Sequence, residues 1–569
     1  HHGHARRIAT RTPGFFSCRL ARRDPAKAHE ELSTLPGVAT ASAHYDLVVV
    51  GSGPAAVKCA VMSAKLGKRV AVVDKKGLVG GICVHTGTIP SKTFREAVLH
   101  LTGYRHQGFY GRSYSPSKNI SMPDLLSRVR KVEGAETDVV TDQLSREGVE
   151  IITGTARFIK SKPGDSVMSA MVLRSSETHE AVSSVYRHVD ADTPKTTISA
   201  DRFLIACGTR PVRPPQVPFD GKFVFDSDQL LWGGVEHIPR DLIVVGAGVI
   251  GMEYACMINV IPGTTVTVVD PRPDVLPFAD SDVIENLQYS MRQNGARFLL
   301  NDKIIQVDKH QLKGDCTVPK VVAHLESGKR VVGDALLYTM GRQGNTDSLC
   351  LKEVDLEADS RGLLQVNDFY QTSNPHIYAC GDVIGYPALA STSMEQGRRA
   401  ALHMWGHRPR LDDDDVGPSE GDNVQEHERV KSDTDGGFLG RLSEQLFPYG
   451  IYTIPEISMI GKTETQLTSE GVPYEVGIAD YQELAKGQML GGADGFLKLI
   501  FHAETLRLLG VHCIGEGATE IIHIGQVVMS QGGTIKYFET AVFNFPTLAE
   551  AYNVAAADGL RKIGQMNML

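Results

Sequence analysis

The sequence lacks the marks of several classes of protein. No apolar run approaches the ~20 residues that a membrane-spanning helix needs, so no membrane span is expected. Basic residues are fewer than acidic ones, 59 against 67, and the net charge of −8 argues against a general nucleic-acid binder. The nine cysteines are scattered without a C-x-x-C pair. This excludes a zinc pattern and a secreted disulfide framework, and no metal site is expected.

Acidic residues are also missing from the first 23 positions, where arginines are frequent and Phe15 and Phe16 lie between them. This composition resembles an organelle transit peptide, so we predict a mitochondrial protein with residues 1–43 as its extension. The alternative is a disordered or artificial tail on a cytoplasmic protein.

Two stretches of the chain each predict a strand, a glycine-rich turn, a helix and a second strand. The first runs from the apolar strand 47–50 through Gly51 to a strand that ends at Asp74. The second runs from the strand 241–245 through Gly246 to a strand that ends at Asp270. The repeat indicates two nucleotide-binding domains. The length of 569 residues predicts about three or four domains in all, because a single core rarely exceeds ~250–300 residues.

Each glycine turn has the spacing of a dinucleotide site. Such a turn lets backbone N–H groups and a helix N-terminus approach a pyrophosphate. An aspartate follows each turn after about 20 residues, where it can accept hydrogen bonds from an adenosine ribose. The sequence therefore predicts two bound dinucleotides.

Further motifs carry a resemblance to a known family. They are the segment Gly80 to Lys92, the segments 206–211 and 340–342, and a strand that enters the turn Gly381-Asp382. Together with the first glycine turn they resemble the pyridine nucleotide-disulfide oxidoreductase superfamily, over roughly residues 44–569. The resemblance implies an α/β fold: two doubly wound Rossmann-like domains, for FAD and then NAD(P), and a C-terminal α+β domain that forms a homodimer.

The resemblance also implies two sets of cofactor contacts. The expected FAD-binding residues are Gly51, Gly53, Pro54, Ala55, Asp74, Lys75, Gly80, Gly81, Cys83, Lys92, Ala156, Gly208, Gly381 and Asp382. The expected NAD(P)-binding residues are Gly246, Gly248, Val249, Ile250, Gly251, Glu253, Asp270, Arg272 and Gly341.

Two positions depart from the disulfide reductases of the superfamily. Cys83 is followed by Thr88 where a second redox cysteine would complete C-x₄-C. Phe545 occupies the place of the histidine that serves the thiols as acid and base, and phenylalanine has no proton to transfer. We expect Glu550, the partner of that histidine in the family, to remain as a structural hydrogen-bond acceptor.

Within the superfamily the chain most resembles the soluble pyridine nucleotide transhydrogenases, in segments 83–92, 344–349, 381–387, 450–458 and 520–526. This implies hydride transfer between NADPH and NAD⁺ through bound FAD, by ping-pong transfer without a redox disulfide. Lys92 and Glu253 are expected, by resemblance, to pair beside the flavin. The alternative for Glu253 is an ordinary helical acid. Cys83 is either a packing residue or a peroxide-sensitive thiol.

Two residues bear on nucleotide preference. Asp270 would repel a 2′-phosphate, whereas Arg272 could bind it. We expect stronger affinity for NAD(H), with NADP(H) accepted through Arg272.

The predicted domains are 44–214 and 335–407 for FAD, 215–334 for NAD(P) and 447–569 for dimerisation. Insertions are expected near 161–200 and at 408–446, the latter acidic. Three other functions stay open: an NAD(P)H diaphorase or quinone reductase, a dihydrolipoamide dehydrogenase-like enzyme, and a flavin-bearing sensor.

Overall fold

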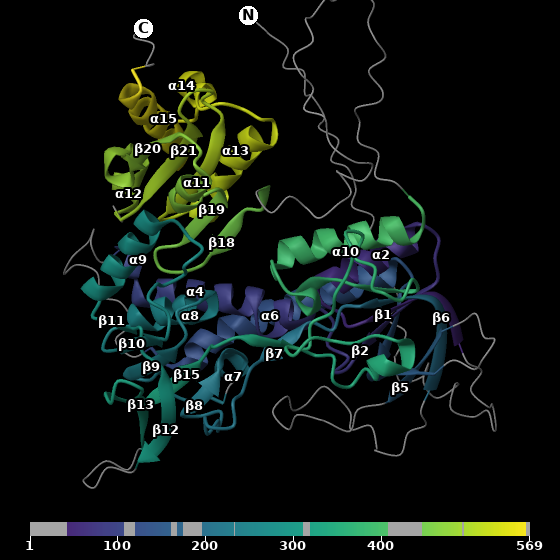
Figure 1. Cartoon of the computed structure of the whole chain (residues 1–569). Coiled ribbons are helices and arrows are strands. Elements are labelled where there is room, and N and C mark those ends of the chain that lie inside the picture. Colours follow the sequence, from purple (N-terminus) through teal and green to yellow (C-terminus); the bar gives the residue numbers. More distant parts are fainter. Residues whose placement is uncertain are drawn as a thin grey trace, which may run out of the picture. The chain divides into compact units, whose positions relative to one another are not determined.

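The computed structural model describes residues 43–106, 120–160, 168–173, 196–232, 234–310, 319–407, 446–491 and 494–564. From His44 onward these residues belong to one compact unit (Figure 1). The predicted transit segment, apart from Ala43, and the predicted acidic insertion, apart from Leu446, lie outside the described residues.

The first sheet has seven strands in the order β3-β2-β1-β6-β5-β4, with β17 paired to β6. The strands are β1 (Ala43–Val50), β2 (Val70–Asp74), β3 (Glu150–Thr153), β4 (Thr155–Ile159), β5 (Met168–Leu173), β6 (Thr196–Ile205) and β17 (Ile377–Ala379). β1 and β2 are parallel with Leu47 opposite Val70, and β4, β5 and β6 are antiparallel. The first predicted βαβ unit is therefore present.

Two helices pack closely on each other beside this sheet: α2 (Pro54–Lys65) and α10 (Ala390–Met404). α2 begins directly after Gly53, and Pro54 occupies its first turn, where a missing N–H costs no helical hydrogen bond. A side chain at Gly397 would collide with the carbonyl of Ala55. This close approach keeps α10 against the helix that follows the first glycine turn.

The second sheet has five parallel strands in the order β11-β10-β9-β15-β8. They are β8 (Val224–Asp226), β9 (Asp241–Val245), β10 (Thr265–Asp270), β11 (Arg297–Leu300) and β15 (Ala335–Tyr338). A three-stranded sheet, β12 (Ile304–His310), β13 (Lys320–Leu325) and β14 (Arg330–Gly333), lies between β11 and β15 in sequence. The short strands β7 (Thr209–Pro211) and β16 (Arg342–Gly344) pair with each other.

One hydrophobic core cluster spans this sheet and its neighbours. It contains residues of α4 (Thr88–Thr102), α6 (Met122–Arg146), α8 (Val249–Asn259) and α9 (Ser281–Gln293), and also Ile451 and Ile457 from the C-terminal region. α7 (Ser227–Trp232) contributes Leu230 and Leu231. No helix among the described residues is long and apolar enough to cross a membrane.

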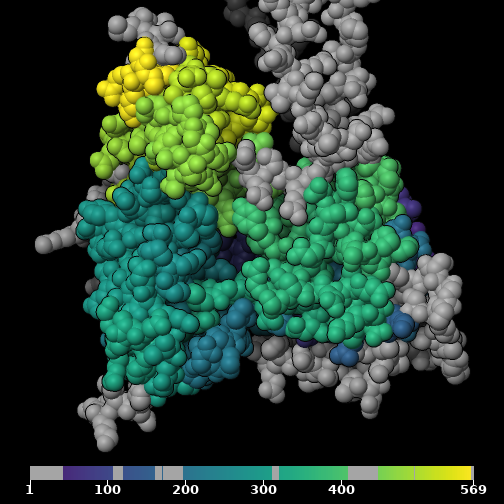
Figure 2. Space-filling view, viewed as in Figure 1, coloured from purple at the N-terminus to yellow at the C-terminus, as the bar shows by residue number. Residues whose placement is uncertain are grey.

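The C-terminal region is built on a five-stranded antiparallel sheet, β18-β19-β22-β21-β20. Its strands are β18 (Tyr449–Ile451), β19 (Ile457–Gly461), β20 (Tyr474–Asp480), β21 (Phe496–His502) and β22 (Leu508–Ile514). The helices are α11 (Glu464–Glu470), α12 (Ala485–Leu490), α13 (Ala518–Ser530), α14 (Lys536–Thr540) and α15 (Ala551–Lys562). This region is the yellow-green body in Figure 2.

The architecture confirms the predicted fold class of two doubly wound domains and an α+β domain. One expectation needs correction: residues 168–173 and 196–200 of the predicted insertion are strands of the first sheet. Ser and Thr make up much of residues 196–200, and β5 and β6 are an antiparallel pair, in which one face of the strands can be polar, so the alternation was hidden. The remainder of that insertion lies outside the described residues.

A buried lysine ties the C-terminal sheet to the second sheet's helix α9. Lys498 on β21 is fully buried, and its Nζ donates to Asp280 at 2.9 and 3.0 Å and to Asp282 at 2.7 Å. Glu464 also pairs with it. Burial alone would lower the pKa of Lys498, but these carboxylates outweigh burial and raise it. The lysine therefore stays charged at neutral pH.

We predict that Lys498→Met lowers the free energy of unfolding by about 3–5 kcal/mol, because three carboxylates lose their shared cation. Calorimetry or urea unfolding measures the change. The matched control is Lys329→Met, whose exposed side chain lies 3.8 Å from Asp302 and should contribute about 0–1 kcal/mol. Equal stability of the two variants would contradict the role given to Lys498.

Candidate active site

The first glycine turn closes tightly against the end of β6. Gly51 has a φ of +104°, and a Cβ there would overlap the carbonyl oxygen of Ala206. Gly53 forms the N-cap of α2 and faces open space, so the turn leaves the helix N-terminus accessible. A pyrophosphate fits such a turn, because backbone N–H groups and the helix dipole favour an anion.

Asp74 ends β2 beside this turn. Its Oδ2 accepts a hydrogen bond of 2.6 Å from Ser52 Oγ, and its Oδ1 accepts one from the backbone N–H of Lys76. Gly154 donates to the carbonyl of Asp74, which brings the start of β4, with Ala156, near the same strand end. Sequence reasoning missed Ser52, which fills a variable position of the glycine motif.

The segment Gly80 to Lys92 forms two successive helices, α3 (Gly81–His85) and α4. Gly81 lies so close to Gly53 that a side chain would overlap it, which places α3 against the first glycine turn. The hydroxyl of Thr86 is buried without a hydrogen-bond partner among the described residues. An unsatisfied buried hydroxyl in this loop fits a polar cofactor beside it.

Cys83 on α3 and Thr88 at the start of α4 lie together. Burial raises the pKa of the Cys83 thiol, and a hydrogen bond with the Thr88 side chain only partly offsets this. The thiol is therefore mainly protonated at neutral pH. A protonated sulfur beside a hydroxyl is a weak nucleophile and has no second sulfur at position 88 to bond with.

Lys92 and Glu253 form the predicted ion pair. Lys92 Nζ lies 3.0 and 2.9 Å from the two oxygens of Glu253, which is almost fully buried on α8. Lys92 also donates to Ser91 Oγ at 3.3 Å. The structure thus joins residues that are far apart in the sequence, Lys92 on α4 and Glu253 on α8, the helix that follows the second glycine turn.

Asp382 is the second residue of a short 3₁₀ helix, Gly381–Ile384, after β17. Burial raises the pKa of its carboxyl group, although Arg342 and a hydrogen bond from Thr209 Oγ1 at 3.3 Å oppose the shift. Arg342 Nε in turn donates to Thr209 Oγ1 at 2.8 Å. Thr209 and Arg342 are additional residues of this region to which sequence reasoning gave no role. Of the other predicted FAD residues, Gly208 adjoins β7 and Lys75 follows β2.

The second glycine turn repeats this geometry with different partners. Gly251 packs so closely on the carbonyl of Gly246 that any side chain would overlap it. Asp270 accepts hydrogen bonds from the backbone N–H of Ala247 at 2.6 Å and from Arg272 Nε and Nη2 at 2.9 and 2.8 Å. Burial would raise the pKa of Asp270, but these hydrogen bonds outweigh it and lower the pKa. Asp270 is therefore ionised and already paired with Arg272.

The remaining predicted NAD(P) residues lie around the same turn. Gly248 is the N-cap of α8, Val249 and Ile250 form its first turn, and Gly341 lies between β15 and β16. Arg272 Nη2 is 4.0 Å from where a Cβ on Gly248 would be. The guanidinium therefore lies at the mouth of the turn, at the carboxyl end of the strands.

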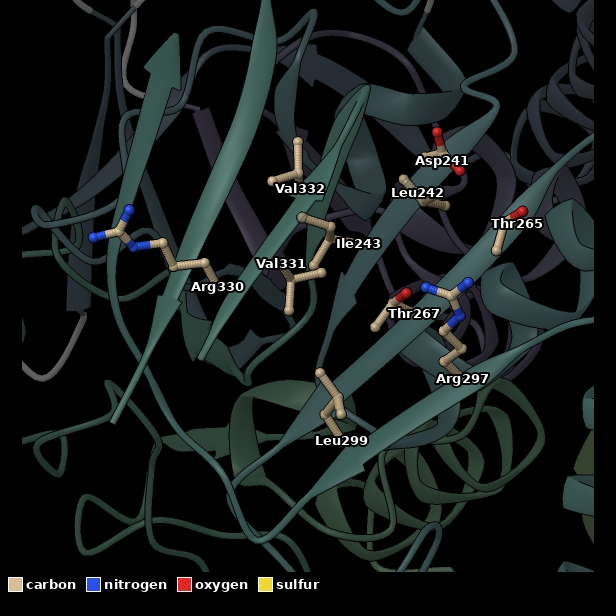
Figure 3. A pocket seen from close by; sticks show the side chains of 10 residues that line it. All are labelled: Asp241, Leu242, Ile243, Thr265, Thr267, Arg297, Leu299, Arg330, Val331 and Val332. Atoms are coloured by element: carbon tan, nitrogen blue, oxygen red, sulfur yellow. The ribbon is translucent and has the colours of Figure 1, made fainter. Parts of the chain in front are cut away.

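A separate cavity of about 240 Å³ lies on one face of this sheet, toward the amino ends of its strands (Figure 3). Its lining includes Asp241, Thr265 and Arg297, which begin β9, β10 and β11. Nucleotides bind at the carboxyl ends of strands in open α/β sheets, so this cavity is not the nucleotide site. In Figure 3 Arg330 points away from Arg297, so the two guanidinium groups do not converge on one ligand.

The C-terminal segment contains Phe545 and Glu550, the two positions where the family has its histidine and glutamate. Phe545 is 74% exposed. Glu550 accepts a hydrogen bond of 3.3 Å from the backbone N–H of Thr547 in a capping box, which confirms the expected structural role. Among the described residues no group of His, Cys, Asp and Glu side chains is arranged to hold a metal ion.

These features define a flavin- and nicotinamide-dependent oxidoreductase, and comparison with known proteins agrees. The chain matches the pyridine nucleotide-disulphide oxidoreductase family over residues 45–397 and the dimerisation domain of that family over residues 447–556. The chain belongs to this FAD-dependent family.

Curated relatives carry a more particular name. The soluble pyridine nucleotide transhydrogenase of Mycobacterium tuberculosis (strain ATCC 25177 / H37Ra) is 44% identical over 523 residues, 92% of this chain and 98% of the relative. That of Erwinia tasmaniensis is 40% identical over 91% of this chain and 98% of its own. Among solved structures, LpdA from Mycobacterium tuberculosis has a TM-score of 0.73 at 26% identity, covering 90% of this chain and 99% of its own.

We predict a pH-dependent effect of Asp382→Asn on the apoprotein. A carboxyl group whose folded pKa lies above its unfolded value of about 3.9 destabilises the fold as the pH rises through that range. The variant should therefore melt at a higher temperature than the wild type at pH 7, and this difference should shrink toward pH 4. Thermal unfolding across this range tests it. Asp347→Asn, at a largely exposed carboxylate, is the control. A difference that grows on acidification would contradict the prediction.

Proposed function

We propose that this protein is an FAD-dependent transhydrogenase that moves hydride between NADPH and NAD⁺ without a redox disulfide. The observation that carries the proposal is the environment of Cys83. Its hydrogen-bond partner is the hydroxyl of Thr88, and burial keeps the thiol protonated. Electrons therefore have no sulfur pair through which to leave, and the names of the curated relatives agree with a reaction that needs none.

The bound flavin would supply the two-electron chemistry, taking a hydride from one nicotinamide and passing it to another. Lys92 and Glu253 act on this step as a pair. The ammonium stabilises negative charge that develops beside it, and the buried carboxylate fixes its position. The glycine turns and Asp382 hold the cofactor and nucleotide in place, because hydride transfer needs the reacting atoms about 3–3.5 Å apart. Phe545 cannot serve a thiol reaction, since its ring carries no transferable proton.

Nucleotide selection is proposed to depend on the pair Asp270 and Arg272. Because Arg272 neutralises Asp270 and lies at the mouth of the turn, a 2′-phosphate would meet a guanidinium rather than an unpaired carboxylate. NAD(H) lacks this phosphate and would use the turn itself. This arrangement fits acceptance of both nucleotides.

The assembly and location are also proposals. The match to the dimerisation domain supports a homodimer. The exposed side chains of Val527, Tyr537, Val542 and Phe545 in that region offer an apolar surface to a second copy. The named relatives are bacterial, which fits the cytoplasmic alternative rather than the mitochondrial prediction. The mitochondrial prediction concerns residues outside the described ones.

Anaerobic stopped-flow measurement tests the proposed reaction. NADPH should bleach the flavin absorbance, NAD⁺ added next should restore it, and NADH should form in equal amount. No thiolate–flavin charge-transfer band should appear, because position 88 has no sulfur. Fast quinone reduction without NADPH-to-NAD⁺ exchange, or turnover of lipoamide, would contradict the proposal.

The Arg272→Ala variant tests nucleotide selection. Its KM for NADPH should rise at least tenfold, because the variant loses a phosphate partner and leaves Asp270 unpaired. Its KM for NADH should change less than threefold. Arg297→Ala removes an exposed arginine from the far end of the same sheet and serves as the control. An unchanged KM for NADPH would show that Arg272 does not bind the phosphate.

A further inference from the structure

Tyr452 contacts both members of the Lys92–Glu253 pair, and it belongs to neither of the helices that carry them. Its backbone N–H donates to Glu253 Oε1 at 2.9 Å. The centroid of its ring lies 4.9 Å from Lys92 Nζ. A cation within about 6 Å of an aromatic centroid is attracted by the ring quadrupole.

Arg95 on α4 holds the segment that follows Tyr452. Arg95 Nε donates to the carbonyl of Thr453 at 3.0 Å, and Arg95 also pairs with Glu456 at 3.4 Å. Arg95 and Lys92 lie three residues apart on α4, hence on neighbouring positions of one helix face. The ring of Tyr452 packs beside Gly450, where a Cβ would lie 3.5 Å from it.

The ammonium of Lys92 has few other neighbours. Its donors are directed to Glu253 and Ser91 Oγ, and its side chain is about one quarter exposed. Burial raises the pKa of the Tyr452 hydroxyl, so the ring is neutral at physiological pH. A neutral aromatic face beside a charged ammonium attracts it and displaces water from that side.

We propose that Tyr452 is a positioning residue for hydride transfer. Its backbone N–H fixes the carboxylate of Glu253, and its ring holds the ammonium of Lys92 in line with that carboxylate. Lys92 thereby keeps one orientation toward the reacting atoms. This rests on the role that the proposed function gives to Lys92. Tyr452 belongs to the C-terminal region, whereas Lys92 and Glu253 belong to the first and second regions of the chain.

The test compares Tyr452→Leu with Tyr452→Phe in the flavin-loaded protein. Phenylalanine keeps the ring and should match the wild type within twofold. Leucine removes the ring and should slow flavin reduction by NADPH about fivefold, in keeping with the usual strength of a cation–π contact. The nucleotide KM should change less than twofold, because Tyr452 does not lie at the second glycine turn. The flavin midpoint potential of the leucine variant should be more negative, since its ammonium stabilises the reduced flavin less.

Three outcomes overturn this role for Tyr452. The leucine variant could match the wild type in rate and potential, both variants could be slowed equally, or the KM alone could change. Equal slowing would assign the effect to the tyrosine hydroxyl rather than to the ring. If the leucine variant does not fold, Tyr452→Met provides the same comparison with a flexible side chain of greater length.

The measurements separate this proposal from the proposed function. Flavin reduction and the midpoint potential need one nucleotide at most, so they report on Tyr452 even if the wild type does not pass hydride to NAD⁺. A wild type that exchanges hydride between nucleotides, with a leucine variant that behaves identically, leaves the proposed function in place and removes the role of Tyr452.

Discussion

One buried carboxylate holds the site together. Glu253 on α8 accepts hydrogen bonds from Lys92 on α4 and from the backbone N–H of Tyr452. Three regions of the chain therefore meet at one charge. Removing one partner of such a buried pair leaves a charge without compensation, at a cost of several kcal/mol. The arrangement of the site is thus tied to the packing of the regions, and Arg95, further along α4, adds a second link to the same C-terminal segment.

The two glycine turns have a similar backbone conformation but differ in the hydrogen-bond partners of their aspartates. Asp74 accepts from the hydroxyl of Ser52, a neutral donor. Asp270 is held by the guanidinium of Arg272. The same motif can therefore present two electrostatic surfaces. A neutral partner leaves the charge of the carboxylate in place, whereas a guanidinium cancels it, and this difference bears on which nucleotide each turn accepts.

The residues that would serve a disulfide have been changed together. Thr88 supplies a hydroxyl to Cys83, and burial keeps that thiol protonated. Phe545 has no acid–base group, and Glu550 now caps a turn through Thr547. By contrast, Lys92 and Glu253, the pair expected beside the flavin, do form an ion pair. The groups that a redox disulfide would need are therefore absent at positions 88 and 545, whereas this ion pair is present.

Much of the fold follows from local patterns. The sequence predicts the two βαβ units, the aspartates that end their second strands, and the strand 508–514. Hydrophobic periodicity and glycine turns are local signals, so they can be read from the sequence. The strand β20 and the strands within the expected insertion were missed, since their polar faces hide the alternation. The sequence by itself determined the two dinucleotide turns and the missing second sulfur. Tertiary structure alone decided that Arg95 donates to the carbonyl of Thr453 and that Tyr452 reaches Lys92. Such contacts depend on how separate elements pack, and spacing along the chain carries no record of that.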